Sequence, residues 1–71
     1  METEDLESFL AVASGLSFSR AAERLGLPRS TLSRRVHRLE ADLGTRLFER
    51  DTRNVRLSEA GRLYAERNAG P

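Results

Sequence analysis

The sequence predicts a mainly α-helical fold, and three observations within residues 18–44 support this. Apolar residues recur at spacings of four, three and four at Leu32, Val36, Leu39 and Leu43, the period of an amphipathic helix. Ahead of them lies Gly26-Leu27-Pro28, where glycine can end one helix and proline can start the next. No carboxylate occurs from residue 24 to residue 39, a segment with five arginines. Two helices joined by a tight turn, with a cationic outer face, are typical of a helix-turn-helix.

The totals limit the chain to one small domain. Its 71 residues are near the lower limit for a self-sufficient core. It has no cysteine, and this excludes a disulfide framework and the usual structural zinc ligands. Residues 1–18 contain four acids and no base, whereas residues 19–56 contain ten arginines and five acids. Positive charge therefore gathers in the middle of the chain, which suggests a polyanionic partner. All twelve basic residues are arginine. This suits phosphate and guanine contacts, although the codon usage of a GC-rich genome explains more of it, so the placement of the arginines carries the argument.

The first predicted helix begins near Thr3, a possible N-cap, and ends at Gly15. Leu6, Phe9, Leu10 and Ala13 follow the spacing of a half-buried helix. We interpret this helix as scaffold, because the acids in its first turn would repel phosphate. Its outer side is expected to face solvent or a partner subunit.

The second predicted helix starts after Ser17-Phe18-Ser19. Ser19 is the predicted cap, and Phe18 is expected to pack back on the helix as a hydrophobic staple. Ser19 and Arg20 are candidate phosphate contacts. Taken alone, Arg20 is as well explained as a solvated surface charge.

The third predicted helix runs from about Pro28 to Leu43 and ends at Gly44. Its N-terminal half is the part that enters the major groove in helix-turn-helix proteins. Arg35 and Arg38 lie further round or further along the helix and suit phosphates, and His37 is interpreted as a surface residue. The candidates for reading base edges are Arg29, Ser30, Thr31, Ser33 and Arg34.

Residues 47–57 predict a small β-hairpin. Apolar and polar residues alternate around Arg50 and Arg56, and the four residues between the two runs favour a turn. A hairpin after the helix pair is a wing. Arg53 at its tip is a candidate for the minor groove, with a solvated loop charge as the alternative.

Ser58 is the predicted cap of a last helix, which has Ala60, Leu63 and Tyr64 on one side. Little of the chain remains to cover Leu63 and Tyr64. Either they pack on the first helix, or a second copy of the chain covers them.

Spaced matches over nearly all of the chain resemble the N-terminal DNA-binding domain of LysR-type transcriptional regulators. The motifs that carry the resemblance are Leu6-Glu7-Ser8-Phe9 with Ala11-Val12-Ala13, Ser17-Phe18-Ser19-Arg20-Ala21-Ala22-Glu23-Arg24-Leu25, Leu32-Ser33-Arg34-Arg35-Val36 with Leu39-Glu40, Leu43-Gly44, Leu47-Phe48-Glu49-Arg50 with Arg53, and Leu57-Ser58-Glu59-Ala60-Gly61.

The resemblance implies a winged helix-turn-helix: a three-helix core, a β-hairpin wing and the start of a C-terminal linker helix. It places the DNA-binding domain at residues 1–57 and the linker, or dimerisation, helix at 58–71. It further implies a homodimer, paired through the linker helix at Leu63 and Tyr64, on an interrupted inverted repeat. Base contacts are implied for the start of the third helix, and backbone or minor-groove contacts for Arg50 and Arg53. Family members also carry a C-terminal effector-sensing domain; its absence here suggests an excised DNA-binding domain.

Two departures from the family pattern change the expected chemistry. Pro28-Arg29 stands where the family commonly has Ser-Gln, and Arg35 stands where glutamine is frequent. Both replace an amide with a guanidinium, so base preferences of glutamine-bearing relatives are not expected to transfer.

Two other functions were weighed against sequence-specific DNA binding. A winged helix can serve as a protein–protein docking module, but that use predicts an apolar or mixed face on the third helix, whereas this one is cationic. An enzyme has almost no support, because the chain has one histidine, no cysteine and no glycine-rich phosphate loop. We expect a bacterial cytoplasmic protein with no cofactor, metal, catalytic residue or membrane segment, whose partners are double-stranded DNA and a second copy.

Overall fold

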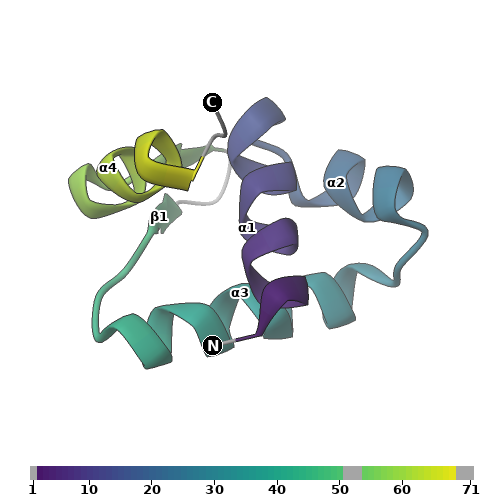
Figure 1. Ribbon diagram of the computed structural model, residues 1–71. Helices are drawn as coiled ribbons and strands as arrows, with labels where there is room; N and C mark the ends of the chain where they lie inside the picture. Colours follow the sequence, from purple (N-terminus) through teal and green to yellow (C-terminus); the bar gives the residue numbers. More distant parts are fainter. Residues whose placement is uncertain (1, 51–53, 69–71) are drawn as a thin grey trace.

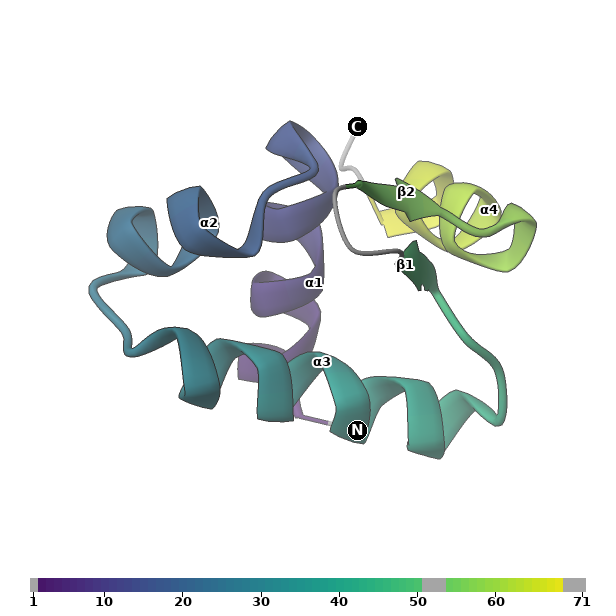
Figure 2. The same ribbon diagram turned by 180° about the vertical axis from the view of Figure 1, so that it is seen from behind.

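The computed structural model describes residues 2–50 and 54–68, which form four helices and a two-stranded hairpin. The elements in chain order are α1 (Thr3–Gly15), α2 (Phe18–Leu25), α3 (Arg29–Leu43), β1 (Phe48–Arg50), β2 (Val55–Leu57) and α4 (Glu59–Asn68). In Figures 1 and 2, α1 crosses α3 and separates α2 on one side from the hairpin and α4 on the other. The winged helix-turn-helix predicted from the sequence is confirmed.

The helix ends follow local sequence, with two corrections. Gly26 and Gly44 take left-handed backbone conformations and end α2 and α3 as predicted. The cap of α2, however, is Ser17 and not Ser19: the Ser17 hydroxyl accepts the backbone N–H of Arg20, and Phe18 is already helical. Thr3 likewise starts α1 without capping it, because the N-cap position is Glu2 and makes no side-chain bond.

The core lies where α1 and α3 cross and extends towards the hairpin. In its aromatic part, Phe48 makes a tilted contact with Phe9 and a T-shaped contact with Phe18, with ring centroids 5.3 and 5.6 Å apart. Of the stripe predicted from the sequence, Leu32, Val36 and Leu39 are fully buried, and Leu43 is partly buried against the core. The buried apolar residues are Phe9, Val12, Phe18, Ala21, Ala22, Leu32, Val36, Leu39, Leu47 and Phe48.

The wing, defined here as residues 48–57, is an antiparallel hairpin in which Phe48 pairs with Leu57 and Arg50 with Val55. Two hydrogen bonds of Ser58 lie at its base: one closes the hairpin, and the other joins it to α4. The Ser58 hydroxyl donates to the Arg46 carbonyl at 2.6 Å and, as predicted, accepts the N–H of Gly61 in α4 at 2.9 Å. At Gly61 the backbone of α4 approaches Leu47, the residue before β1, so closely that a Cβ would overlap the Leu47 carbonyl oxygen.

Candidate nucleic-acid interface

The N-terminal half of α3 presents an exposed polar face. Arg29, Ser30 and Arg34 are exposed, while Thr31 and Ser33 are partly buried beside them. The structure therefore brings all five predicted base-reading candidates onto one half of one helix. Ser30 and Arg34 lie on the side opposite the buried stripe of Leu32, Val36 and Leu39, while Arg29 is exposed at the first position of the helix.

Arg38, further along α3, makes a contact that the sequence did not predict. Its Nε donates to Oδ2 of Asp5 at 2.7 Å, and its Nη2 donates to Oδ1 at 2.6 Å. The two bonds form a bidentate salt bridge between α3 and α1. The Asp5 side chain is fully buried, whereas 46% of the Arg38 side chain is exposed. The hydrogen bond from Arg38 lowers the pKa of the Asp5 carboxyl against the opposing effect of burial, and the same bond raises the pKa of Arg38.

Glu4 extends this contact to a second arginine. Its Oε2 lies 3.3 Å from Nη2 of Arg35, and its Oε1 lies 3.5 Å from Nη2 of Arg38. The acids of α1 thus lie against the arginines of α3, a role more specific than the scaffold expected from the sequence. No local pattern could have revealed it, because Asp5 and Arg38 are 33 positions apart.

The start of α2 meets the wing. Ser19 and Arg20, the predicted phosphate contacts, are exposed in the first turn of α2. The guanidinium carbon of Arg50 lies 4.4 Å from the centre of the Phe18 ring, a cation–π contact that joins β1 to this turn. Arg53, the candidate at the wing tip, lies outside the described residues.

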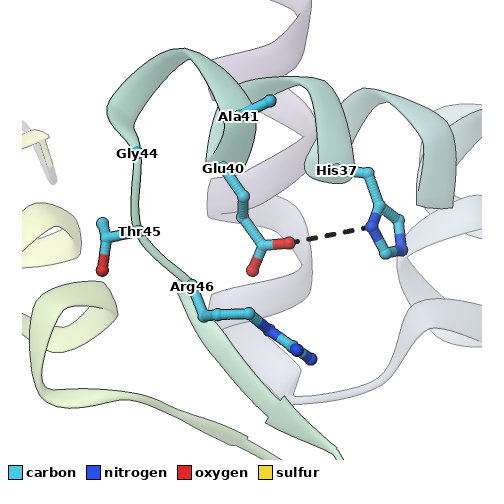
Figure 3. A pocket seen from close by; sticks show the side chains of 6 residues that line it. All are labelled: His37, Glu40, Ala41, Gly44, Thr45 and Arg46. Atoms are coloured by element: carbon cyan, nitrogen blue, oxygen red, sulfur yellow. Dashed lines mark ion pairs between the residues drawn. The ribbon is translucent and has the colours of Figure 1, made fainter.

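The far end of α3 carries an open hollow of about 420 Å³, lined by His37, Glu40, Ala41, Gly44, Thr45 and Arg46. Figure 3 shows His37 and Glu40 reaching it from α3, with His37 Nδ1 3.9 Å from Glu40 Oε1. The other carboxylate oxygen of Glu40 accepts the backbone N–H groups of Leu47 and Phe48 at 2.7 and 3.2 Å. Glu40 is therefore a structural clamp at the start of β1. Within residues 2–50 and 54–68, no group of three or more acids and histidines could hold a metal ion.

The two dimer candidates on α4 differ in their surroundings. The Tyr64 ring packs on Phe9 of α1, with centroids 5.5 Å apart, so the chain itself covers part of it. Leu63 is 47% exposed, beside a shallow hollow of about 230 Å³ lined by Ala60, Leu63, Tyr64 and Arg67. The first alternative stated for the pair therefore holds for Tyr64, which packs on α1. The described residues leave Leu63 exposed, and its coverage by a second copy stays a prediction.

Comparison with known protein families shows which family the chain belongs to. Residues 3–62 match the model of the bacterial regulatory helix-turn-helix proteins of the lysR family. The chain belongs to the LysR family. This confirms the resemblance found in the sequence, namely that the chain is a LysR-type DNA-binding domain.

Individual LysR-family proteins are similar over most of the chain. The HTH-type transcriptional regulator ShiR of Corynebacterium glutamicum is 55% identical over 64 residues, which are 90% of this chain and 22% of ShiR. The crystal structure of the BenM DNA-binding domain in complex with catB site 1 DNA aligns with a TM-score of 0.89 and 36% identity, covering 94% of this chain and 75% of that one. The CbnR DNA-binding domain in its DNA complex gives 0.89 and 39%, covering 94% and 77%. The chain spans about a fifth of the length of ShiR.

LysR-family relatives of this chain are named as transcriptional regulators, not as enzymes. Among the helices of residues 2–50 and 54–68, none combines the length and the apolar character needed to cross a bilayer.

Proposed function

We propose that this LysR-family domain binds double-stranded DNA sequence-specifically, with α3 in the major groove and the wing at the minor groove or backbone. The observation that carries the proposal is the exposed face of α3, where Ser30 and Arg34 lie opposite the buried stripe and the exposed Arg29 stands at the first position of the helix. An arginine that reaches a guanine edge contributes about 1–3 kcal/mol of discrimination between bases. The BenM and CbnR domains, which were solved as DNA complexes, support DNA binding by this domain, since both align with a TM-score of 0.89.

The phosphate contacts proposed here flank that face. Ser19 and Arg20 lie at the start of α2, Arg50 is held over Phe18, and Arg35 and Arg38 follow along α3. Arg53 is proposed to reach the minor groove from the wing tip, as the resemblance implies. Such contacts position the protein and dominate its salt dependence, while base contacts select the site.

Two copies are proposed to bind an interrupted inverted repeat, paired through the linker helix. The exposed Leu63, with the hollow beside it, supports a partner on α4. In this proposal residues 1–57 bind DNA and residues 58–71 begin the linker. In this proposal a small-molecule effector would act only through the C-terminal domain that LysR-family members carry. The protein would act in the bacterial cytoplasm, where the nucleoid lies.

The test is selection from random-sequence duplexes, followed by salt titration of binding to the selected duplex and to a scrambled one. Log affinity should fall with log salt at a slope of about −0.9 per phosphate neutralised for both duplexes. A large affinity gap, with two chains bound per selected repeat, is the expected result. Equal affinity for both duplexes, or no binding at low salt, would instead favour a protein-docking module.

A further inference from the structure

Arg38 lies at one edge of the DNA-facing side of α3. It follows Ser30 and Arg34 at successive steps of four residues, and each step turns the helix by about 40° at 3.6 residues per turn. These steps bring Arg38 to the edge where α1 begins, since its guanidinium bonds to Asp5 in the first turn of α1. Figure 1 shows the start of α1 beside α3. A helix in the major groove has phosphates beside its edges, so this position suits backbone contact more than base contact.

The guanidinium of Arg38 is held on one side only. Nε and Nη2 both donate to Asp5, and Nη2 also lies 3.5 Å from Glu4. Within the described part of the chain, the remaining nitrogen Nη1 has no hydrogen-bond partner, and nearly half of the side chain is exposed. Nη1 therefore remains able to donate to a group outside the protein.

We propose that Asp5 is a positioning residue for DNA binding: it holds Arg38 so that Nη1 meets a phosphate beside α3. The inference rests on the proposed DNA-binding function. A free surface arginine loses side-chain entropy when it grips a phosphate, and an arginine already fixed by a buried carboxylate loses less. Asp5 thus supports binding to a polyanion although it carries a negative charge.

An argument from net charge alone predicts the opposite effect of Asp5 on DNA affinity, and this makes the proposal testable. Removing a carboxylate near DNA should strengthen binding if only net charge matters. Glu4 is the matched control, because it lies in the same turn of α1 and carries the same charge. Its side chain is 52% exposed and its contacts with Arg35 and Arg38 are longer, at 3.3 and 3.5 Å.

The experiment measures duplex binding by fluorescence anisotropy over a series of salt concentrations. It uses the selected duplex and the scrambled one, with the wild type, Asp5→Asn, Glu4→Gln, Arg38→Ala and the Asp5→Asn/Arg38→Ala double variant. Arg38→Ala should weaken both duplexes about tenfold and flatten the salt slope by about 0.9 per chain. Asp5→Asn should weaken binding to both duplexes about three- to tenfold, since Arg38 still bonds to the phosphate but is no longer held in place. Glu4→Gln should bind as tightly as the wild type or more tightly.

The double variant separates positioning from an independent effect. If Asp5 acts through Arg38, it should bind no more weakly than Arg38→Ala. The NMR signal of the Arg38 Nε–H gives a readout that general destabilisation would not move: slow exchange in the folded wild type and fast exchange in folded Asp5→Asn. Circular dichroism at the assay temperature establishes that each variant is folded.

Arg38→Lys decides the question if Asp5→Asn does not fold. It keeps the positive charge beside Asp5 but replaces the planar fork with one nitrogen, so it should bind several-fold more weakly than the wild type. The positioning role is overturned if folded Asp5→Asn binds as tightly as the wild type or more tightly, or if Arg38→Lys matches the wild type. A wild type that binds neither duplex would instead refute the proposed function.

Discussion

The guanidinium of Arg50 stacks on the ring of Phe18, with its central carbon 4.4 Å from the ring centre. The contact joins β1 of the wing to the first residue of α2, two elements that the tight turn and α3 separate in sequence. Phe18 is almost fully buried and its ring also touches Phe48. Phe18 thereby joins the wing to the helix-turn-helix, in addition to the Glu40 carboxylate that accepts the N–H of Phe48.

Loss of this contact should lower stability slightly. Arg50→Ala is expected to reduce the free energy of unfolding by about 0.5–1 kcal/mol, the contribution of an exposed cation–π pair. Denaturation by urea measures it. The control is Arg56→Ala on the paired strand, where the partner Glu49 lies 3.7 Å away and both side chains are well exposed; its effect should be smaller. Equal losses for the two variants would argue against the stacking contribution.

Glu40, a nearly buried acid of α3, should contribute strongly to stability. Glu40→Ala leaves the backbone N–H groups of Leu47 and Phe48 without the carboxylate that accepts them, at a cost of about 1–3 kcal/mol for each buried donor. Urea denaturation of the variant should show this loss. The control is Glu23→Ala, at an exposed position of α2, which should change the free energy of unfolding by less than about 0.5 kcal/mol. A Glu40 variant as stable as the Glu23 variant would contradict the clamp.

Two glycines in helices should respond to alanine with opposite signs. Gly61→Ala would press a methyl group into the Leu47 carbonyl and should destabilise by about 1–3 kcal/mol. Gly15→Ala meets no atom within 4 Å and has an ordinary helical backbone, so it should be neutral or stabilise by up to about 1 kcal/mol. Thermal unfolding of both variants measures the difference, and a Gly61 variant with wild-type stability would show that α4 can move away from β1.

Acid should remove the stability contributed by Asp5. The Arg38 hydrogen bond lowers its pKa in the folded state below the ordinary value of 3.8. A lowered folded-state pKa gives stability that is present above the unfolded-state pKa and is lost as pH falls through the folded-state pKa. Wild type should therefore exceed Asp5→Asn in melting temperature at neutral pH, and the gap should shrink below about pH 4. A gap that stays constant down to pH 2 would exclude this linkage.

Arg34 should govern discrimination, in contrast to Arg38. Arg34→Ala is expected to reduce the affinity gap between selected and scrambled duplexes, by about 1–3 kcal/mol per half-site if Arg34 pairs with guanine. Arg38→Ala should weaken both duplexes alike. Competition binding with the two duplexes measures both gaps. The division of labour fails if the two variants lose discrimination equally.

Much of the fold could be predicted from local sequence, because helix periodicity and helix ends depend on neighbouring residues. Leu32, Val36 and Leu39 formed the buried stripe of α3, and Gly26 and Gly44 ended their helices in left-handed conformations. The predicted cap of α2, Ser19, was wrong, because Ser17 and Ser19 can both cap on local grounds. Burial of Phe18 against Phe48 decided it, because this places Phe18 in the first turn and Ser17 before it.

The sequence by itself determined the helices, the wing, the family and the set of arginines from which the candidate interface is drawn. Tertiary structure alone decided how those arginines are held. Arg38 meets Asp5 from 33 positions away, Arg50 meets Phe18 across the helix pair, and Tyr64 packs on α1 while Leu63 stays exposed. The physical reason is that periodicity assigns a residue to a face of its own helix, whereas the partner on that face depends on how the helices cross.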